Sequence, residues 1–333
     1  MCTALVLISC TAHAERIEPP LELLHDPTNL VVAGTIETVD STADRVVFQR
    51  KDLLAGRAAL APQDDEVEVR VPHEALGHLA VGKDYIFAYT LFAPDPRRPG
   101  KLLAKRQGAT VLVAPGLEPA VFEDTPDVRR LLDLGNQAEG EDSAELLELL
   151  LHNLAGKNPA LQNLAANELA LAPELRQRLG PPERKTIRTF VDDPAAAPLG
   201  RMALLEAAAQ FPQNFGAGWA LDSAARILAS APTSGVENGD ADRATLLRST
   251  LLLFDQTTAV SLSPQTVRRW LGSDSVALVE PSLRLLQRQA PQTARRTIEQ
   301  VASDAGTPAQ TRIFLREYLK RFDASRARGG ASG

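Results

Sequence analysis

Two histidines in the segment His73-Glu74-Ala75-Leu76-Gly77-His78 have the residue type that a metal centre requires. A zinc site on one helix needs its two histidines four residues apart, because that spacing places both imidazoles on the same face. The spacing here is five, which turns the second imidazole away by about 140° at roughly 100° per residue. Pro72 and Gly77 also disfavour a long helix at this point. We therefore predict a short connector between strands, with surface histidines and no metal.

Arginines form the second chemically notable group, because they are concentrated near the end of an otherwise acidic chain. Some of them are spaced four residues apart, so that two guanidinium groups can project together from one helical face. Such a surface suits an acidic partner, a phospholipid headgroup or an envelope polymer; the alternative is a solvated capping repeat. The candidate partner-binding residues are Arg284, Arg288, Arg295, Arg296, Arg312 and Arg316.

Cysteine usage removes several reaction classes. Cys2 and Cys10 are the only cysteines, and both lie at the start of the chain. If this start is removed, no thiol is left for nucleophilic catalysis or for binding a metal. The glycine-rich stretches lack the lysine and the strand-turn-helix context of a phosphate loop. We assign no catalytic residue, cofactor or metal from the sequence.

The first fourteen residues have the pattern of an export signal. An apolar core over residues 4–8 is followed by Ala12-His13-Ala14, a small-x-small sequence that signal peptidase accepts. We therefore predict a signal peptide over residues 1–14 and a periplasmic or secreted protein. Leu7-Ile8-Ser9-Cys10 also resembles a bacterial lipobox, in which Cys10 would carry the lipid of an outer-membrane lipoprotein. An unprocessed cytosolic start is the third alternative, and contact with a membrane is expected only if Cys10 is lipidated.

Length and composition predict a folded protein of more than one domain. The chain has 333 residues, of which 44% are apolar and 23% charged, values that are ordinary for globular proteins. The formal net charge is −6, so we expect no nucleic-acid partner.

Residues 28–115 have the period of β-structure. Residues 30–39 and 46–48 are rich in β-branched side chains and flank a polar turn, which predicts a hairpin. Residues 66–71 alternate strictly between polar and apolar, and two more apolar runs bring the total to about five strands. This layout resembles the OB-type, netrin-module-like domains of exported bacterial proteins, which implies a small antiparallel barrel that binds proteins or extended ligands. An ordinary β-sandwich is the alternative.

Residues 127–323 have the period of amphipathic helices, after a proline-rich and acidic segment at 116–126 that we interpret as a linker. Apolar stripes alternate with short polar breaks, so that each unit consists of a helix, a break and a second helix. Leucines of the second helices recur at intervals of roughly 40 residues, at Leu164, Leu204, Leu247, Leu283 and Leu315. The pattern resembles HEAT and armadillo arrays; an irregular α-bundle is the alternative. Residues 324–333 are predicted to be a disordered tail.

The sequence therefore predicts an α+β multidomain protein, with a small N-terminal antiparallel β-barrel or sandwich followed by a HEAT-like α-helical repeat domain. Stacked helices present an extended surface, so we expect an exported envelope protein that binds or scaffolds a protein partner. One alternative is an enzyme with a pocket at the junction between the two domains. Another is a lipid-anchored structural lipoprotein.

Overall fold

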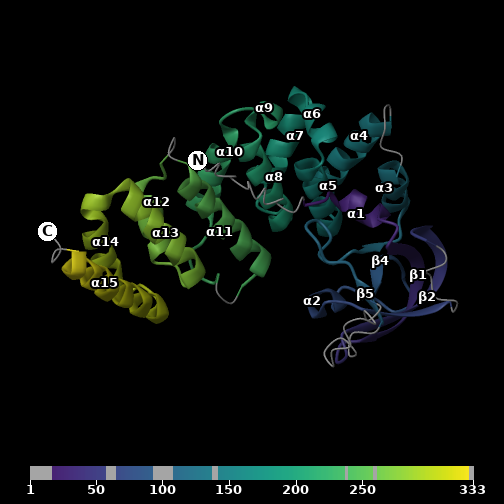
Figure 1. Cartoon of the computed structure of the whole chain (residues 1–333), viewed down its shortest axis with the longest axis horizontal. Helices are drawn as coiled ribbons and strands as arrows, with labels where there is room; N and C mark the ends of the chain where they lie inside the picture. Colours follow the sequence, from purple (N-terminus) through teal and green to yellow (C-terminus); the bar gives the residue numbers. More distant parts are fainter. Residues whose placement is uncertain are drawn as a thin grey trace, which may run out of the picture.

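The computed structural model describes residues 17–57, 65–92, 108–136, 142–236, 239–257 and 261–329. A β-barrel comes first in the chain, and an elongated all-helical array follows it (Figure 1). The predicted α+β class, with the strands before the helices, is confirmed. The predicted signal peptide at 1–14 and the candidate lipidation site Cys10 lie outside the described residues.

The β-sheet closes on itself. In the described ranges its strands are β1 (Asn29–Asp40), β2 (Arg45–Ala55), β3 (Glu66–Arg70), β4 (Asp84–Phe92), β5 (Gly108–Val111) and β6 (Val121–Glu123). The strand order is β1, β2, β3, β5, β4, β6, and β1 also pairs with β4, which closes the barrel. The pairs are antiparallel except β3 with β5, which is parallel. A short helix, α2 (His73–Leu76), connects β3 to β4.

Alternating apolar side chains fill the barrel. In β3 both valines are buried and both glutamates are exposed, as the strict alternation predicts. Phe48 of β2 and Phe87 of β4 stack with their ring centroids 4.4 Å apart. At Gly34 of β1, an added Cβ atom would lie only 2.6 Å from the carbonyl oxygen of Gln49. Glycine is therefore needed at this position, where the backbones of β1 and β2 approach each other closely.

The segment 116–126, which we predicted to be a linker, belongs to the barrel. Phe122 lies in β6 and pairs with Ile86 of β4, and Leu117 and Ala120 are fully buried. Prolines and carboxylates flank these apolar positions, so the local pattern favours a loop and hides the strand. The β-region thus extends beyond residue 115, and α3 (Pro126–Asn136) follows almost at once.

The barrel and the array pack directly against each other through α1 (Pro20–His25), a short helix that the sequence pattern does not reveal. This helix contacts β1, α3 and α5 (Pro159–Leu171). The backbone N–H of Leu21 in α1 donates to Oε2 of Glu168 in α5, at 2.9 Å. A segment that precedes the barrel in the chain is therefore bound to α5, a helix of the first pair of the array.

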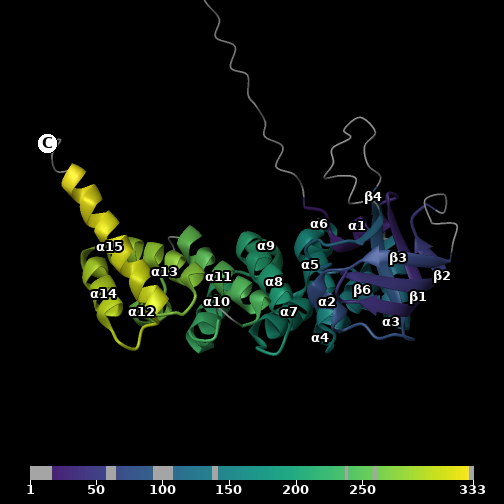
Figure 2. The same ribbon diagram turned by 90° about the horizontal axis from the view of Figure 1, so that it is seen from below.

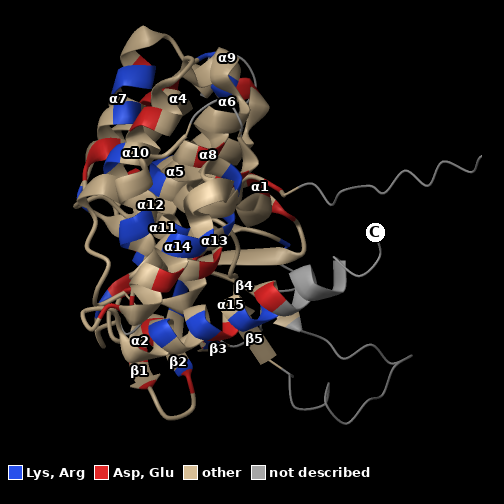
Figure 3. Ribbon diagram, turned by 90° about the vertical axis from the view of Figure 1, so that its left-hand side faces the viewer, with Lys and Arg blue, Asp and Glu red and all other residues tan. Residues whose placement is uncertain are grey.

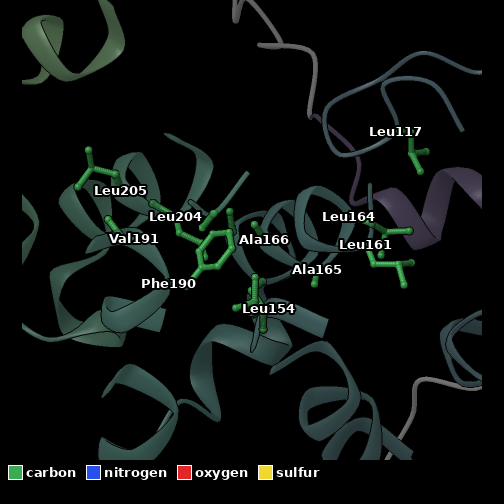
Figure 4. Packing of buried hydrophobic residues seen from close by; sticks show 14 of the residues in the cluster. Leu117, Leu154, Leu161, Leu164, Ala165, Ala166, Phe190, Val191, Leu204 and Leu205 are labelled. Carbon is green, nitrogen blue, oxygen red and sulfur yellow. The ribbon is translucent and has the colours of Figure 1, made fainter. Parts of the chain in front are cut away.

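The apolar core is continuous across this junction. Figure 4 shows it extending from Leu117, in the barrel region, past α5 to Phe190 and Leu204 in the next helices of the array. Residues of both regions belong to the same hydrophobic cluster. The two regions are thus joined by a packed interface and not by a free tether.

The helical region is a row of helix pairs in two layers. Among the described residues, the first layer comprises α4 (Asp142–Ala155), α7 (Pro181–Asp192), α10 (Trp219–Ser230), α12 (Pro264–Leu271) and α14 (Pro291–Ser303). The second layer comprises α5, α8 (Pro198–Gln210), α11 (Ala241–Gln256), α13 (Val276–Gln289) and α15 (Ala309–Gly329). Each first-layer helix packs on its partner in the second layer, and the second-layer helices contact one another in chain order. Figure 2 shows the resulting row, with α15 at its end.

The repeating leucines identify the second layer. Leu164, Leu204, Leu247, Leu283 and Leu315 lie on α5, α8, α11, α13 and α15, in that order, and all are buried. Two short helices, α6 (Pro173–Gln177) and α9 (Pro212–Phe215), lie in connections between pairs. The interval read from the sequence is thus the interval between successive second-layer helices.

The end of the chain differs from its prediction. α15 extends to Gly329, so residues 324–329, which we assigned to a disordered tail, are helical. Residues 330–333 lie outside the described ranges. None of the described helices is both long enough and apolar enough to cross a membrane.

Candidate functional site

A cavity of about 430 Å³, which we call the junction cavity, lies between α1, the short helix that contacts both the barrel and the array, and helices α3 to α6. Residues of α1, α3, α4, α5 and α6 contribute to its wall. The titratable side chains that line it are mostly carboxylates: Glu18, Glu22, Asp26, Glu168, Glu174 and His25. An enzyme at this junction, the alternative function, requires such a cavity.

Glu168 is the chemically most unusual of these residues. Its side chain is only 5% exposed, and Oε2 accepts the N–H of Leu21. Burial raises the pKa of Glu168 to about 7, against the lowering effect of the Leu21 hydrogen bond, and the charges of Glu174 and Glu22 raise it further. A carboxyl group with this pKa can bind and release a proton near neutral pH.

His25 and Ser143 also line the cavity. Nδ1 of His25 lies 2.7 Å from the carbonyl oxygen of Leu21, and because a carbonyl only accepts, Nδ1 carries the proton and donates it. Within the described part of the chain, no hydrogen bond joins Ser143 to His25 or to Glu168. The cavity wall therefore holds no assembled pair of a nucleophile and its base among these side chains.

Both histidines of the 73–78 segment are exposed. α2 spans four residues between β3 and β4, as expected of a short connector. His73 is exposed, and its Nδ1 lies 2.9 Å from Oδ1 of Asp44. Across the ranges that the structure describes, no three His, Cys, Asp or Glu side chains are arranged to hold a metal ion.

Half of the candidate partner-binding arginines make ion pairs inside the array. Arg284 and Arg288 of α13 both reach Asp255 at the end of α11, at 3.0 and 3.8 Å. Arg288 also donates to the last carbonyl oxygens of α11, where a positive charge is favourable. Arg295 of α14 pairs with Asp323 of α15. These three guanidinium groups connect neighbouring helices.

Arg296, Arg312 and Arg316 make no ion pair with any described residue. Arg296 and Arg316 are exposed, and Arg312 is partly exposed. Arg312 and Arg316 lie one turn apart on α15, beside Ile313, whose side chain is 58% exposed. Figure 3 views the array from this end, with lysines and arginines placed along α15 among acidic residues. We call the surface formed by Arg312, Ile313 and Arg316 the end face.

Comparisons with protein-family models, with curated proteins and with solved structures find no match to the chain. The fold and the surfaces described above therefore carry the functional argument by themselves.

A pocket at the junction belonged to the alternative function, but none of its residues was predicted, although the sequence contains one signal of them. Leu161, Leu164 and Glu168 follow the spacing of a buried helical face, so that a carboxylate occupies an apolar position. A charged residue at such a position needs a partner or a cavity. The sequence does not reveal that α1 supplies the N–H group that binds this carboxylate.

Proposed function

We propose that this protein is a binding or scaffold protein of the bacterial cell envelope, which holds a protein partner on the surface of its helical array. The observation that carries the proposal is the two-layer row of helix pairs, in which the second-layer helices contact one another in chain order. Arrays of this kind create extended surfaces that other proteins use for docking. The stacked pairs favour kinship with HEAT and armadillo arrays. The non-sequential strand order of the closed barrel favours the OB type.

The end face is the part of the array that we propose for the contact. Its arginines are free of intramolecular ion pairs within the described residues, whereas Arg284, Arg288 and Arg295 are already paired. An exposed isoleucine beside two arginines suits a partner segment that combines an apolar side chain with carboxylates. The chemistry of the end face thus favours an acidic protein segment as the partner.

Export of the protein is a separate part of the proposal. It depends on the signal-like pattern at residues 1–14, with Cys10 as the lipidation site in the alternative. The intact mass of the protein isolated from its native host tests it. We expect a mature chain that begins near Glu15; a diacylglycerol mass on Cys10 would indicate the lipoprotein, and a retained Met1 would contradict export.

Charge reversal tests the end face. The double variant Arg312→Glu/Arg316→Glu should lose the envelope protein that the wild type captures, because an acidic partner is then repelled. Arg248→Glu/Arg268→Glu is the matched control, since it makes the same charge change at exposed positions on α11 and α12. Equal capture by both double variants would contradict the proposed contact.

A second candidate function is an enzyme at the junction cavity, and the raised pKa of Glu168 favours it. Glu168 would then act as a general acid or base on a substrate in the cavity. Glu168→Gln tests this alternative, because the variant keeps the shape of the side chain and cannot exchange the proton. A reaction that Glu168→Gln leaves at the wild-type rate would exclude Glu168 from the chemistry.

A further inference from the structure

We propose that a second surface of the array, a hollow between α7, α8 and α10, receives an aspartate or glutamate side chain of the protein partner through the guanidinium of Arg201. The hollow has a volume of about 470 Å³. It is distant in sequence from the end face and is formed by the middle of the array. The inference rests on the proposed function, since it names the partner's chemistry at a second contact.

Arg201 is a buried arginine without a carboxylate partner. It lies on α8 and is 7% exposed, yet no carboxylate of the described residues comes within ion-pair distance of it. Its Nε donates to the carbonyl oxygen of Val191 at 2.9 Å. Nη1 and Nη2 have no hydrogen-bond partner in the described part of the chain, and Arg201 lines the hollow. A buried charge without a counter-ion is costly, and a bound anion would remove this cost.

The bond to Val191 also has a structural explanation, because it places a positive charge at the end of α7, where carbonyl groups lack partners. That role uses one of the five N–H donors of the guanidinium. It leaves Nη1 and Nη2 unused at the hollow. Capping of α7 therefore explains the position of Arg201 but not why Nη1 and Nη2 lack hydrogen-bond partners.

The charges around the hollow favour an anion. Asp192 is already bound by Arg226, with the Nη2 to Oδ2 distance at 2.7 Å, and Arg188 lies 3.8 Å from the same carboxylate. Burial lowers the pKa of the Arg201 guanidinium, and the charges of Asp193 and Asp192 oppose this effect. Asp192 and Asp193 thus lie near three arginines: Arg188, Arg201 and Arg226. One positive charge is left without a counter-ion.

The walls of the hollow favour a carboxylate on an aliphatic stem. Pro194, Ile227 and Ala229 line the hollow together with Arg201. The hydroxyl of Ser230, which also lines it, already donates its hydrogen to the carbonyl oxygen of Arg226. Two parallel N–H groups match the two oxygens of a carboxylate, whereas a phosphate would leave oxygens facing apolar walls. The methylene groups of a glutamate or aspartate can pack against those walls.

Nuclear magnetic resonance of the wild-type protein provides the first test. The probe is a blocked peptide with one glutamate between leucines, compared with the same peptide carrying glutamine. We expect the glutamate peptide to shift the Arg201 Nε–H and the Ile227 and Ala229 amide signals saturably, and to bind about tenfold or more tightly than the glutamine peptide. No shift at these positions, or equal binding of both peptides, would overturn the proposal.

Two other anions distinguish the source of the ligand. Propionate that binds as tightly as the glutamate peptide would indicate a site for a free carboxylic acid and overturn the partner contact. Inorganic phosphate that binds more tightly than either would overturn the carboxylate assignment. Weaker binding of both is the result that supports a protein side chain.

Arg201→Lys completes the test, because lysine keeps the positive charge but lacks the two parallel N–H groups. We expect the affinity for the glutamate peptide to fall about tenfold or more, while Arg268→Lys, the same substitution at an exposed position of α12 outside the hollow, leaves it unchanged. Unchanged affinity in a folded Arg201→Lys protein would contradict the role of the guanidinium. The proposed function fails separately, if reversal of Arg312 and Arg316 has no effect on capture while the Arg201 signal still responds to the peptide.

Discussion

The barrel and the array bury their apolar surfaces in opposite ways. In the barrel, β1 is paired with β2 on one side and β4 on the other, so the sheet closes. In the array, each second-layer helix contacts the next, and the row ends at α15, which packs on α14 and α13. Closure of a sheet pairs the backbone N–H and C=O groups of its edge strands. An open row of helices instead leaves one helix face uncovered at its end. The end of the array, where this face is uncovered, is the region at which we propose that a partner binds.

The same comparison concerns cooperativity. Removing a side chain from a closed barrel disturbs every strand that faces it, because the core is common to all of them. Removing one from the end of a row disturbs mainly the last pair. The following substitutions test this difference, from the largest expected effect to the smallest.

Phe87→Ala should have the largest effect. The ring is fully buried and stacks on Phe48, so its removal should lower the free energy of unfolding by about 3–5 kcal/mol. Urea unfolding followed by circular dichroism measures the change. Val81→Ala is the control, because Val81 is 62% exposed in the barrel region and should change stability by less than about 0.5 kcal/mol. Equal effects of the two substitutions would contradict the packing of the barrel.

Leu315→Ala and Leu247→Ala compare the end of the array with its middle. Both leucines are buried in the second layer, and each truncation should cost about 2–5 kcal/mol where it acts. Hydrogen exchange should show lost protection confined to α14 and α15 for Leu315→Ala, and spread to α8 and α13 for Leu247→Ala. Loss over the whole array in both variants would instead indicate one cooperative helical bundle.

Glu168 makes stability depend on pH at the junction of the two regions. Its pKa is about 7 in the folded protein and near 4.5 without the fold, so the folded state binds the extra proton between these values. The free energy of unfolding should therefore fall as pH rises from about 5 to about 8, by up to about 3 kcal/mol from this group. Thermal unfolding at several pH values measures the slope. Glu168→Gln should reduce this slope, and an unchanged slope in the variant would show that Glu168 does not cause the pH dependence.

Asn158→Ala should have the smallest effect. Oδ1 of Asn158 accepts the backbone N–H of Ala160 at 3.0 Å and that of Leu161 at 3.3 Å, which caps the start of α5. Loss of this cap should cost about 1 kcal/mol in urea unfolding. Asn158→Asp keeps an accepting oxygen and serves as the control. If aspartate and alanine destabilise the protein equally, the cap does not contribute.

Local patterns in the sequence predict most of the elements. Alternation identifies β3, and the recurring leucines from Leu164 to Leu315 identify the second layer, because one face of each element is buried along its length. β6 and α1 escape prediction, since they are short and gain their stability from β4 and α5, which are distant in the chain.

The spacing of arginines does not predict which of them are free to bind a partner. Arg284 and Arg288 have the same spacing as Arg312 and Arg316, so the sequence treats the pairs alike. The fold separates them, because Asp255 on another helix binds only the first pair. Arg201 and its hollow depend on three helices at once, and no local pattern contains that information.

Photo-cross-linking in cells tests most directly whether the end of the array is the binding surface. A photoreactive amino acid would replace Ile313 on α15 or, as a matched control, Val81 in the barrel region; both are branched aliphatic residues, 58% and 62% exposed. We expect a discrete protein adduct from position 313 that disappears on reversal of Arg312 and Arg316, and no such adduct from position 81. The same adduct from both positions, or an adduct from position 81 alone, would contradict binding at the end face.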